Sequence, residues 1–101
     1  MTQQAYVRAV RDLYIRLPQT SKRFSRSDSH LASDLHQRHV PFETVRSALL
    51  LTIANRLYRE GPPLPTIRSL HYFAPVIDEV LIKPLPPGYV QYLAYKIAAF
   101  K

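Results

Sequence analysis

Residues 40–61, VPFETVRSALLLTIANRLYREG, constrain the possible folds more than any other stretch of the chain. Pro41 suits the first turn of a helix, and Glu43 places a negative charge near the helix start, where the helix dipole favours it. The apolar side chains that follow at steps of three and four are Phe42, Val45, Leu49, Ile53 and Leu57. This spacing is that of one face of an α-helix.

The middle of this helix is apolar in almost every direction around its axis. The residues between those of the first face are also apolar: Ala48, Leu50, Leu51 and Ala54. A helix of this kind is surrounded by other elements instead of lying on a surface. Gly61 can supply the left-handed residue that ends a helix, and the two prolines after it prevent continuation. The sequence therefore predicts a buried central helix over residues 41–60.

The length and composition of the chain limit the classes of protein to which it can belong. With 101 residues, of which 47% are hydrophobic, the chain is expected to fold as one domain, residues 1–101, around a core that needs no disulfide or metal. The absence of cysteine excludes a disulfide scaffold and thiol catalysis, and it fits the reducing conditions of the cytoplasm. No stretch approaches the roughly 18 apolar residues of a membrane-spanning helix, so we expect no membrane association.

Two helices are expected before the central one. Thr2 can cap a first helix that runs to about residue 17, with a buried stripe of apolar and aromatic side chains. Residues 19–27 then form a polar and basic connection. Ser27 is a suitable N-cap for a short second helix to about residue 39, with Asp28 in its first turn.

The segments after the central helix also show helical patterns. Thr66 can cap a short helix over TIRSLHYF, and Pro75 can open another over PVIDEVLIK, although one kinked helix would give almost the same pattern. A last helix is expected over residues 89–100. No segment alternates cleanly between apolar and polar residues, so no sheet is expected. The sequence thus predicts an all-α, compact single-domain bundle of five or six helices around the central one.

The chain carries a net charge of +7, which is large for its size and indicates an acidic partner, with nucleic acid first and DNA before RNA. Between residues 8 and 26, six lysines and arginines accompany a single acid, Asp12. Guanidinium groups bind phosphate oxygens through paired hydrogen bonds, and a basic loop can follow a phosphate backbone. The expected nucleic-acid contacts are Arg8, Arg11, Lys22, Arg23 and Arg26, with Arg38 and Arg46 as secondary contacts.

Several aromatic residues allow two interpretations each. Phe24, within the basic connection, can stack on an exposed base or pack into the core, and we favour the core. Tyr92 and Tyr95 stand off the apolar face of the last helix, whereas Tyr89 lies on it. Exposed tyrosines suit protein interfaces, and packing at the edge of the core is the alternative. Tyr92 and Tyr95 are therefore candidate partner-binding residues.

Neither a metal site nor a catalytic site is expected. His36 and His39 could share a helix face, with His30 or Asp34 nearby, but no cysteine is available to complete a zinc site. The seven acidic residues are scattered along the chain and form no obvious pair for acid–base chemistry. No cofactor is implied, and the sequence favours a protein that is not an enzyme.

The segment LASDLHQRHVPFETVRSAL resembles the helix-turn-helix pattern of DNA-binding proteins. Ala32 and Leu35 match its first helix, Val40 its turn, and Val45 with Ala48 its second helix. The resemblance implies that the start of the second helix faces DNA. The residues at that position are Glu43, Thr44, Arg46 and Ser47.

A second resemblance covers more of the chain. A basic first helix, the pattern LAxxLxxxxVPxxxVxxAL and then IRSLHYFAPVIDEV are similar, in this order, to helical modules of bacterial and mobile-element replication proteins, including the DnaD-like domains of primosome components. The matching residues are Val45, Ala48, Ile67, Leu70, Tyr72, Phe73 and Ile77. The resemblance implies an accessory role in replication or transposition, through DNA or through a larger protein.

These observations give three functional hypotheses in order of preference. The first is a non-enzymatic nucleic-acid-binding accessory factor that contacts phosphates through a basic N-terminal helix and loop. The first alternative is a protein–protein adaptor in a nucleoprotein complex, which would use Tyr92, Tyr95 and the proline-rich connection 61–65. The second alternative is a small helix-turn-helix transcription regulator, which would need to form a dimer to match two half-sites.

Overall fold

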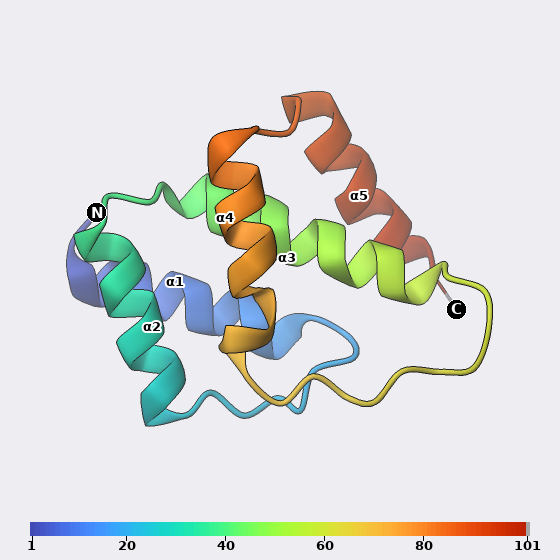
Figure 1. Ribbon diagram of the computed structural model, residues 1–101, viewed down its shortest axis with the longest axis horizontal. Helices are drawn as coiled ribbons and strands as arrows, with labels where there is room; N and C mark the ends of the chain where they lie inside the picture. Colours follow the sequence, from blue (N-terminus) through green and yellow to red (C-terminus); the bar gives the residue numbers. More distant parts are fainter. Residues whose placement is uncertain (101) are drawn as a thin grey trace.

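Five α-helices and one 3₁₀ helix form the fold of residues 1–100, and α3 runs through its centre (Figure 1). The computed structural model describes residues 1–100. In chain order the elements are α1 (Gln3–Arg16), α2 (Arg26–Gln37), α3 (Phe42–Leu57), η1 (Leu70–Phe73), α4 (Ala74–Ile82) and α5 (Pro87–Ala99). None of these helices, within residues 1–100, has the length and the apolar character needed to cross a membrane.

The other elements surround α3. It packs against α1, η1, α4 and α5, whereas α2 packs against α1 and η1. Figure 1 shows α4 crossing α3 and α5 lying beside its C-terminal half. The α3 residues with no exposed surface are Val45, Ala48, Leu49 and Ile53. The predicted all-α compact bundle of five or six helices around a buried central helix is confirmed.

α1 forms where the sequence predicts it. The Thr2 hydroxyl accepts a hydrogen bond from the Ala5 amide (3.1 Å) and caps the helix start. The buried side chains of α1 are Tyr6, Val10 and Tyr14. The Tyr6 hydroxyl donates to the Val40 carbonyl (2.8 Å), and burial raises the pKa of Tyr6 to about 12, although the nearby Arg38 lowers it. Tyr6 is therefore a neutral donor that fixes the chain before α3 to α1.

The predicted N-cap of α2, Ser27, is wrong, because Ser25 caps this helix. The Asp28 amide donates to the Ser25 hydroxyl (3.1 Å), and the Ser25 amide donates to Asp28 Oδ2 (2.9 Å). This reciprocal capping box needs an acceptor side chain three residues after the cap. Ser25 has Asp28 at that spacing, whereas Ser27 has His30.

The Asp28 carboxylate also joins α2 to η1. Its other oxygen, Oδ1, accepts hydrogen bonds from the Ser69 hydroxyl (2.8 Å) and the Leu70 amide (2.9 Å). Asp28 is fully buried, and no cation of residues 1–100 forms an ion pair with it. Burial alone raises the pKa of Asp28, but the hydrogen bonds outweigh burial and hold the pKa below its ordinary value. Asp28 is a buried anion held by neutral donors.

α3 ends earlier than predicted. Its last residue is Leu57, and Tyr58 is the C-cap, with its amide bonded to the Ala54 carbonyl (3.1 Å). Gly61 does take a left-handed conformation (φ 109°), but it lies in the connection that follows and not at the helix end. The two prolines after Gly61 supply no amide donors for a further helical turn, so the chain leaves the helix and turns back.

The segment before η1 is extended, so the predicted short helix capped by Thr66 is wrong. The Ile67 amide donates to the Gln19 carbonyl, and the Ile67 carbonyl accepts from the Ser21 amide, both at 2.8 Å. These bonds use the groups that a helix would need, so helical structure begins only at η1, which Ser69 caps. η1 continues directly into α4, as the kinked-helix alternative predicts.

α5 forms close to its predicted range, but its apolar face is narrower than predicted. Val90 and Leu93 are buried. Tyr89, which was expected on the apolar face, is instead exposed and stacks on Tyr92 with ring centroids 6.2 Å apart. The reason is that α5 packs mainly against one neighbour, α3, so a narrow strip of its surface is covered.

The substitution Asp28→Asn tests whether the buried carboxylate holds α2 to η1. An asparagine side chain keeps one oxygen, but its NH₂ group would face the N–H and O–H groups that now donate to the second carboxylate oxygen. We therefore expect the free energy of unfolding to fall by about 2–4 kcal/mol at pH 7. The pKa of Asp28 is depressed in the folded state, so its stabilisation is complete above the unfolded pKa of about 3.9 and is lost as the pH falls through the folded value. Urea unfolding followed by circular dichroism should show the difference shrinking in acid.

Asp12→Asn is the matched control, because its side chain makes no hydrogen bond or ion pair within residues 1–100. We expect this variant to stay within about 0.5 kcal/mol of the parent protein. Equal stability of the two variants at pH 7 would contradict the assigned role of Asp28.

Candidate nucleic-acid interface

A groove between α1 and α2 presents two arginines. Arg8 and Arg11 stand on the exposed side of α1. They line a hollow of about 420 Å³, here called the α1–α2 groove. Its other lining residues are Gln3, Gln4, Val7, Ser29 and Ser33. Apart from the valine, all of these side chains can donate hydrogen bonds, and no carboxylate lines the groove.

A second hollow, of about 430 Å³, lies between the α1–α2 connection and the extended segment before η1. Its lining residues are Ser21, Arg23, Ser25, Thr66 and Arg68. Every one of these side chains can donate hydrogen bonds, and none of them is a carboxylate. We call this site the arginine hollow. It holds one predicted contact, Arg23, and one arginine that the sequence did not single out, Arg68.

The backbone pairing of Ile67 builds the arginine hollow. The pairing is parallel, so the residues after each partner run in the same direction, and Figure 1 shows the two connections side by side. Neighbouring side chains on an extended segment point to opposite sides. Ile67 and Phe24 pack on the core, whereas Arg68 and Arg23, the residues next to them, line the hollow. The same pairing therefore seals the core and brings the two arginines together.

Arg68 shows what the sequence could and could not reveal. Thr66 and Ile67 are β-branched, and β-branched residues favour extended backbone over helix. The sequence therefore contains a local indication that residues 66 and 67 are extended. The partner of the extended segment lies more than forty positions earlier in the chain, at Thr20, and no local pattern identifies it.

The groove and the hollow lie one helical turn apart at the start of α2. Ser25 lines the hollow and Ser29 lines the groove, and the Ser29 amide donates to the Ser25 carbonyl (3.0 Å). Arg26 lies between them in the chain and is exposed. The partial positive charge of the first turn of α2 is already matched by Asp28 through the capping box, so the arginines are the groups here that can attract a further anion. We define the basic surface as Arg8, Arg11, Arg23, Arg26 and Arg68.

The arginines of the basic surface are not neutralised by carboxylates of residues 1–100. The ion pairs in that range involve two other arginines. Arg38 pairs with Asp34 (3.6 Å) and with Asp78 (3.9 Å). Arg46 pairs with Glu43 (3.6 Å). Arg38 and Arg46, the predicted secondary contacts, thus lie outside the basic surface and already have acidic partners.

Two other residues of the α1–α2 connection, Lys22 and Phe24, contact the rest of the protein. The Lys22 ammonium donates to the Leu17 carbonyl at the C-terminal end of α1, where the helix dipole favours a cation. Phe24 is half-buried, with its ring centroid 5.6 Å from that of Tyr14. The interpretation that Phe24 packs into the core is confirmed. Lys22 remains exposed, but its ammonium is turned toward the protein.

The helix-turn-helix arrangement is not formed. The two helices of the resemblance are α2 and α3, and α2 packs chiefly on α1 and η1. Ser47 is buried and Arg46 pairs with Glu43, so positions that the resemblance assigns to DNA do not form an open surface. A recognition helix must expose one side along its length to lie in a groove, whereas α3 is largely covered by other elements beyond its first turn.

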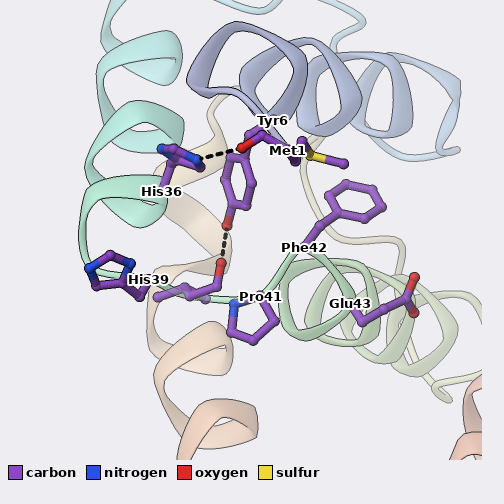
Figure 2. Close-up of a pocket in the computed structure, with 8 residues that line it drawn as sticks. Met1, Tyr6, His36, His39, Pro41, Phe42 and Glu43 are labelled. Carbon is purple, nitrogen blue, oxygen red and sulfur yellow. Dashed lines mark hydrogen bonds between the residues drawn. The ribbon is translucent and has the colours of Figure 1, made fainter.

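A further hollow, of about 510 Å³, contains His36 and His39, the two histidines considered as metal ligands (Figure 2). His36 Nε2 donates to the Met1 carbonyl (3.1 Å), and the His36 ring packs against Tyr6 with centroids 5.1 Å apart. Figure 2 shows Glu43, on the wall of the same hollow, pointing away from both imidazole rings. No group of three or more metal-ligating side chains gathers anywhere in residues 1–100.

One serine and one histidine lie at hydrogen-bond distance on the surface. Ser27 Oγ and His71 Nε2 are 3.0 Å apart and join α2 to η1. Nucleophilic catalysis by such a pair also needs a group that orients the imidazole. Asp28, the neighbouring carboxylate, has both oxygens bonded to other donors, so it does not serve this purpose.

Exposed aromatic side chains gather in a groove of about 200 Å³ between α3 and α5. Its lining residues are Ala54, Asn55, Tyr58, Tyr89, Tyr92, Leu93 and Lys96. Tyr92 is 52% exposed, and Lys96 Nζ lies 4.2 Å from the ring centroid of Tyr58. Tyr95 is 67% exposed but does not line the groove. Of the two candidate partner-binding residues, the structure brings only Tyr92 into a shaped site.

Arg56 holds the connection that carries Arg68. Its guanidinium donates to Gln19 Oε1 (2.7 Å), to the Tyr72 hydroxyl (3.0 Å) and to the Pro65 carbonyl. Arg56 is 8% exposed, and no carboxylate of residues 1–100 pairs with it. Its neutral acceptors come from both segments that border the arginine hollow and from η1. Arg56 thus ties α3 to the walls of the hollow.

Comparisons with known proteins return no match. No protein-family model, no curated protein sequence and no solved structure matches this chain.

The substitution Arg56→Lys tests whether the Arg56 guanidinium holds α3 to the two segments that border the arginine hollow. A lysine ammonium is a point charge and cannot reproduce the planar fork that reaches three acceptors, so we expect a loss of about 1–3 kcal/mol in the free energy of unfolding. Hydrogen exchange at the Ser21 and Ile67 amides should also become faster, because their pairing lies between the walls that Arg56 holds.

The control for this prediction is Arg59→Lys. Arg59 is exposed, and its guanidinium donates only to the nearby Pro62 carbonyl among residues 1–100. We expect a change of less than about 0.5 kcal/mol and no change in exchange at the Ser21 and Ile67 amides. Identical exchange in the two variants would argue against the role of Arg56.

Proposed function

We propose that this protein is a non-enzymatic accessory factor that binds nucleic acid, DNA before RNA, through the basic surface. The observation that carries the proposal is that four arginines line two neighbouring hollows, with the exposed Arg26 on the helical turn between them, and that none of the five has an ion-pair partner within residues 1–100. Guanidinium groups bind phosphate oxygens in pairs of hydrogen bonds, and a strand of nucleic acid offers a row of phosphates. A replication or transposition complex in the cytoplasm is the setting that the resemblance of residues 31–49 and 67–80 favours.

The mechanism of binding is electrostatic. Each phosphate neutralised by an arginine releases condensed counterions, and this release supplies most of the affinity at low salt. The side chains that line the two hollows are suited to phosphate and sugar oxygens, which carry no sequence information. We therefore propose binding without sequence specificity.

A second candidate function, that of a protein–protein adaptor, is supported by the groove between α3 and α5. Its tyrosines are exposed, and two of them, Tyr89 and Tyr92, stack on each other. Tyrosine is enriched at protein–protein interfaces. The proline-rich connection 61–65 is exposed as well. In that case the partner-binding residue is Tyr92, and replacing it with serine should abolish assembly with the partner and leave nucleic-acid binding unchanged.

A salt titration tests the proposed function. With four to five phosphate contacts, affinity for labelled single- and double-stranded DNA and for RNA should fall about two to three orders of magnitude between about 50 and 200 mM salt. Fluorescence anisotropy measures this directly. The absence of binding to any of the three at low salt would overturn the proposal and leave an acidic protein as the best explanation of the +7 charge.

Single Arg→Gln substitutions assign the contacts. Removing Arg11, Arg26 or Arg68 should reduce the slope of log affinity against log salt by about one unit each, because one phosphate contact is lost. Arg38→Gln is the matched control. Its side chain already pairs with Asp34 and Asp78, so the slope should change less.

A further inference from the structure

The arginine hollow differs in chemistry from the open α1–α2 groove. Its polar side-chain groups are two guanidinium groups and three hydroxyls, which lie among the apolar stems of these side chains, and each of the polar groups can donate a hydrogen bond. They come from two backbone segments fixed by the Ile67 pairing, by Arg56 and by the Asp28 hydrogen bonds. The backbone that carries Arg23 and Arg68 is therefore positioned before any ligand arrives, so binding has to order only their exposed side chains.

The charge of the hollow matches a particular kind of phosphate. A phosphodiester inside a strand carries one negative charge, and two of its oxygens are bonded to sugars. A phosphomonoester at a strand end carries close to two negative charges at neutral pH and has three free oxygens. Two arginines with three hydroxyls supply two positive charges and more donors than a diester can use. Asp28, the nearest carboxylate in the chain, is buried and does not line the hollow.

We infer that the arginine hollow binds the terminal phosphomonoester of a nucleic-acid strand, with Arg23 and Arg68 on the phosphate oxygens. The inference rests on the proposed function and adds to it a preference for strand ends. The α1–α2 groove, which lies one helical turn from the hollow at the start of α2, takes the backbone phosphates that follow. The hollow sets the position of the end, and the groove supplies affinity that does not depend on the end.

The experiment compares oligodeoxynucleotides of one sequence that differ only at their ends. One strand carries a 5′-phosphate, one a 3′-phosphate and one hydroxyls at both ends, each labelled at the opposite end or internally. A hydroxyl-ended strand that is longer by two nucleotides matches the added charge of the monoester. Anisotropy titrations with the parent protein should show about tenfold tighter binding to one of the phosphate-ended strands than to either hydroxyl-ended strand.

Variants separate the two parts of the surface. Arg68→Gln should bring the affinity ratio between phosphate-ended and hydroxyl-ended strands to about one, and Arg23→Gln should do the same. Arg8→Gln should weaken binding to all strands and leave the ratio unchanged, because Arg8 lines only the groove. All three arginines are exposed, so thermal melting should confirm unchanged folding.

The outcomes distinguish this inference from the function on which it rests. Equal binding of phosphate-ended and hydroxyl-ended strands would overturn the inference and leave nucleic-acid binding in place. A preference that Arg8→Gln removes and Arg68→Gln retains would also overturn it. No binding of any strand at low salt would overturn both, even if inorganic phosphate alone bound the protein, because the assigned ligand is a strand end.

Discussion

The buried carboxylate of Asp28 is the interaction on which the rest of the structure depends. A buried charge without an ion-pair partner is tolerated only where hydrogen bonds replace its hydration. Here the donors come from the start of α2 and from the segment that enters η1, so both must lie at the same place. That requirement brings residues 66–70 back across the molecule after α3 ends, and it sets the position of Arg68 beside the α1–α2 connection.

The arginines of this protein fall into two groups: some bind acceptors within the protein, and others have no ion-pair partner in the described part of the chain and account for much of the exposed positive charge. Arg56 donates hydrogen bonds to neutral acceptors within the protein. Arg38 pairs with two carboxylates, Asp34 and Asp78. The arginines of the basic surface have no carboxylate partner within residues 1–100. Uncompensated positive charge destabilises a folded domain through self-repulsion. Its concentration along two neighbouring hollows and the helical turn between them is therefore the feature that most favours a polyanionic partner.

The sequence predicted what local patterns determine. α3 was recognised because its apolar periodicity and its proline start lie within one stretch, and α1 because Thr2 and the following stripe are equally local. Two errors were local, at the cap of α2 and at the end of α3, and the error with the largest consequence occurs where a distant segment decides the backbone. Ile67 is extended because residues near Thr20 pair with it, which also explains why Arg68 was missed. The prediction of Arg8, Arg11, Arg23 and Arg26 rested on charge density alone, and only the folded chain could show that the first three line neighbouring hollows and that Arg26 is exposed between them.

The anion inside the protein and the proposed anion outside it are connected. Asp28 lies in the first turn of α2, the turn that begins with Arg26, and its charge is balanced by hydrogen bonds and not by an arginine. Its oxygens already accept hydrogen bonds from Ser25, Ser69 and Leu70, so they do not draw the guanidinium groups into internal ion pairs. A buried carboxylate that is saturated in this way leaves the donors of the basic surface open. An exposed carboxylate at the same place would instead have competed with phosphate for the arginines.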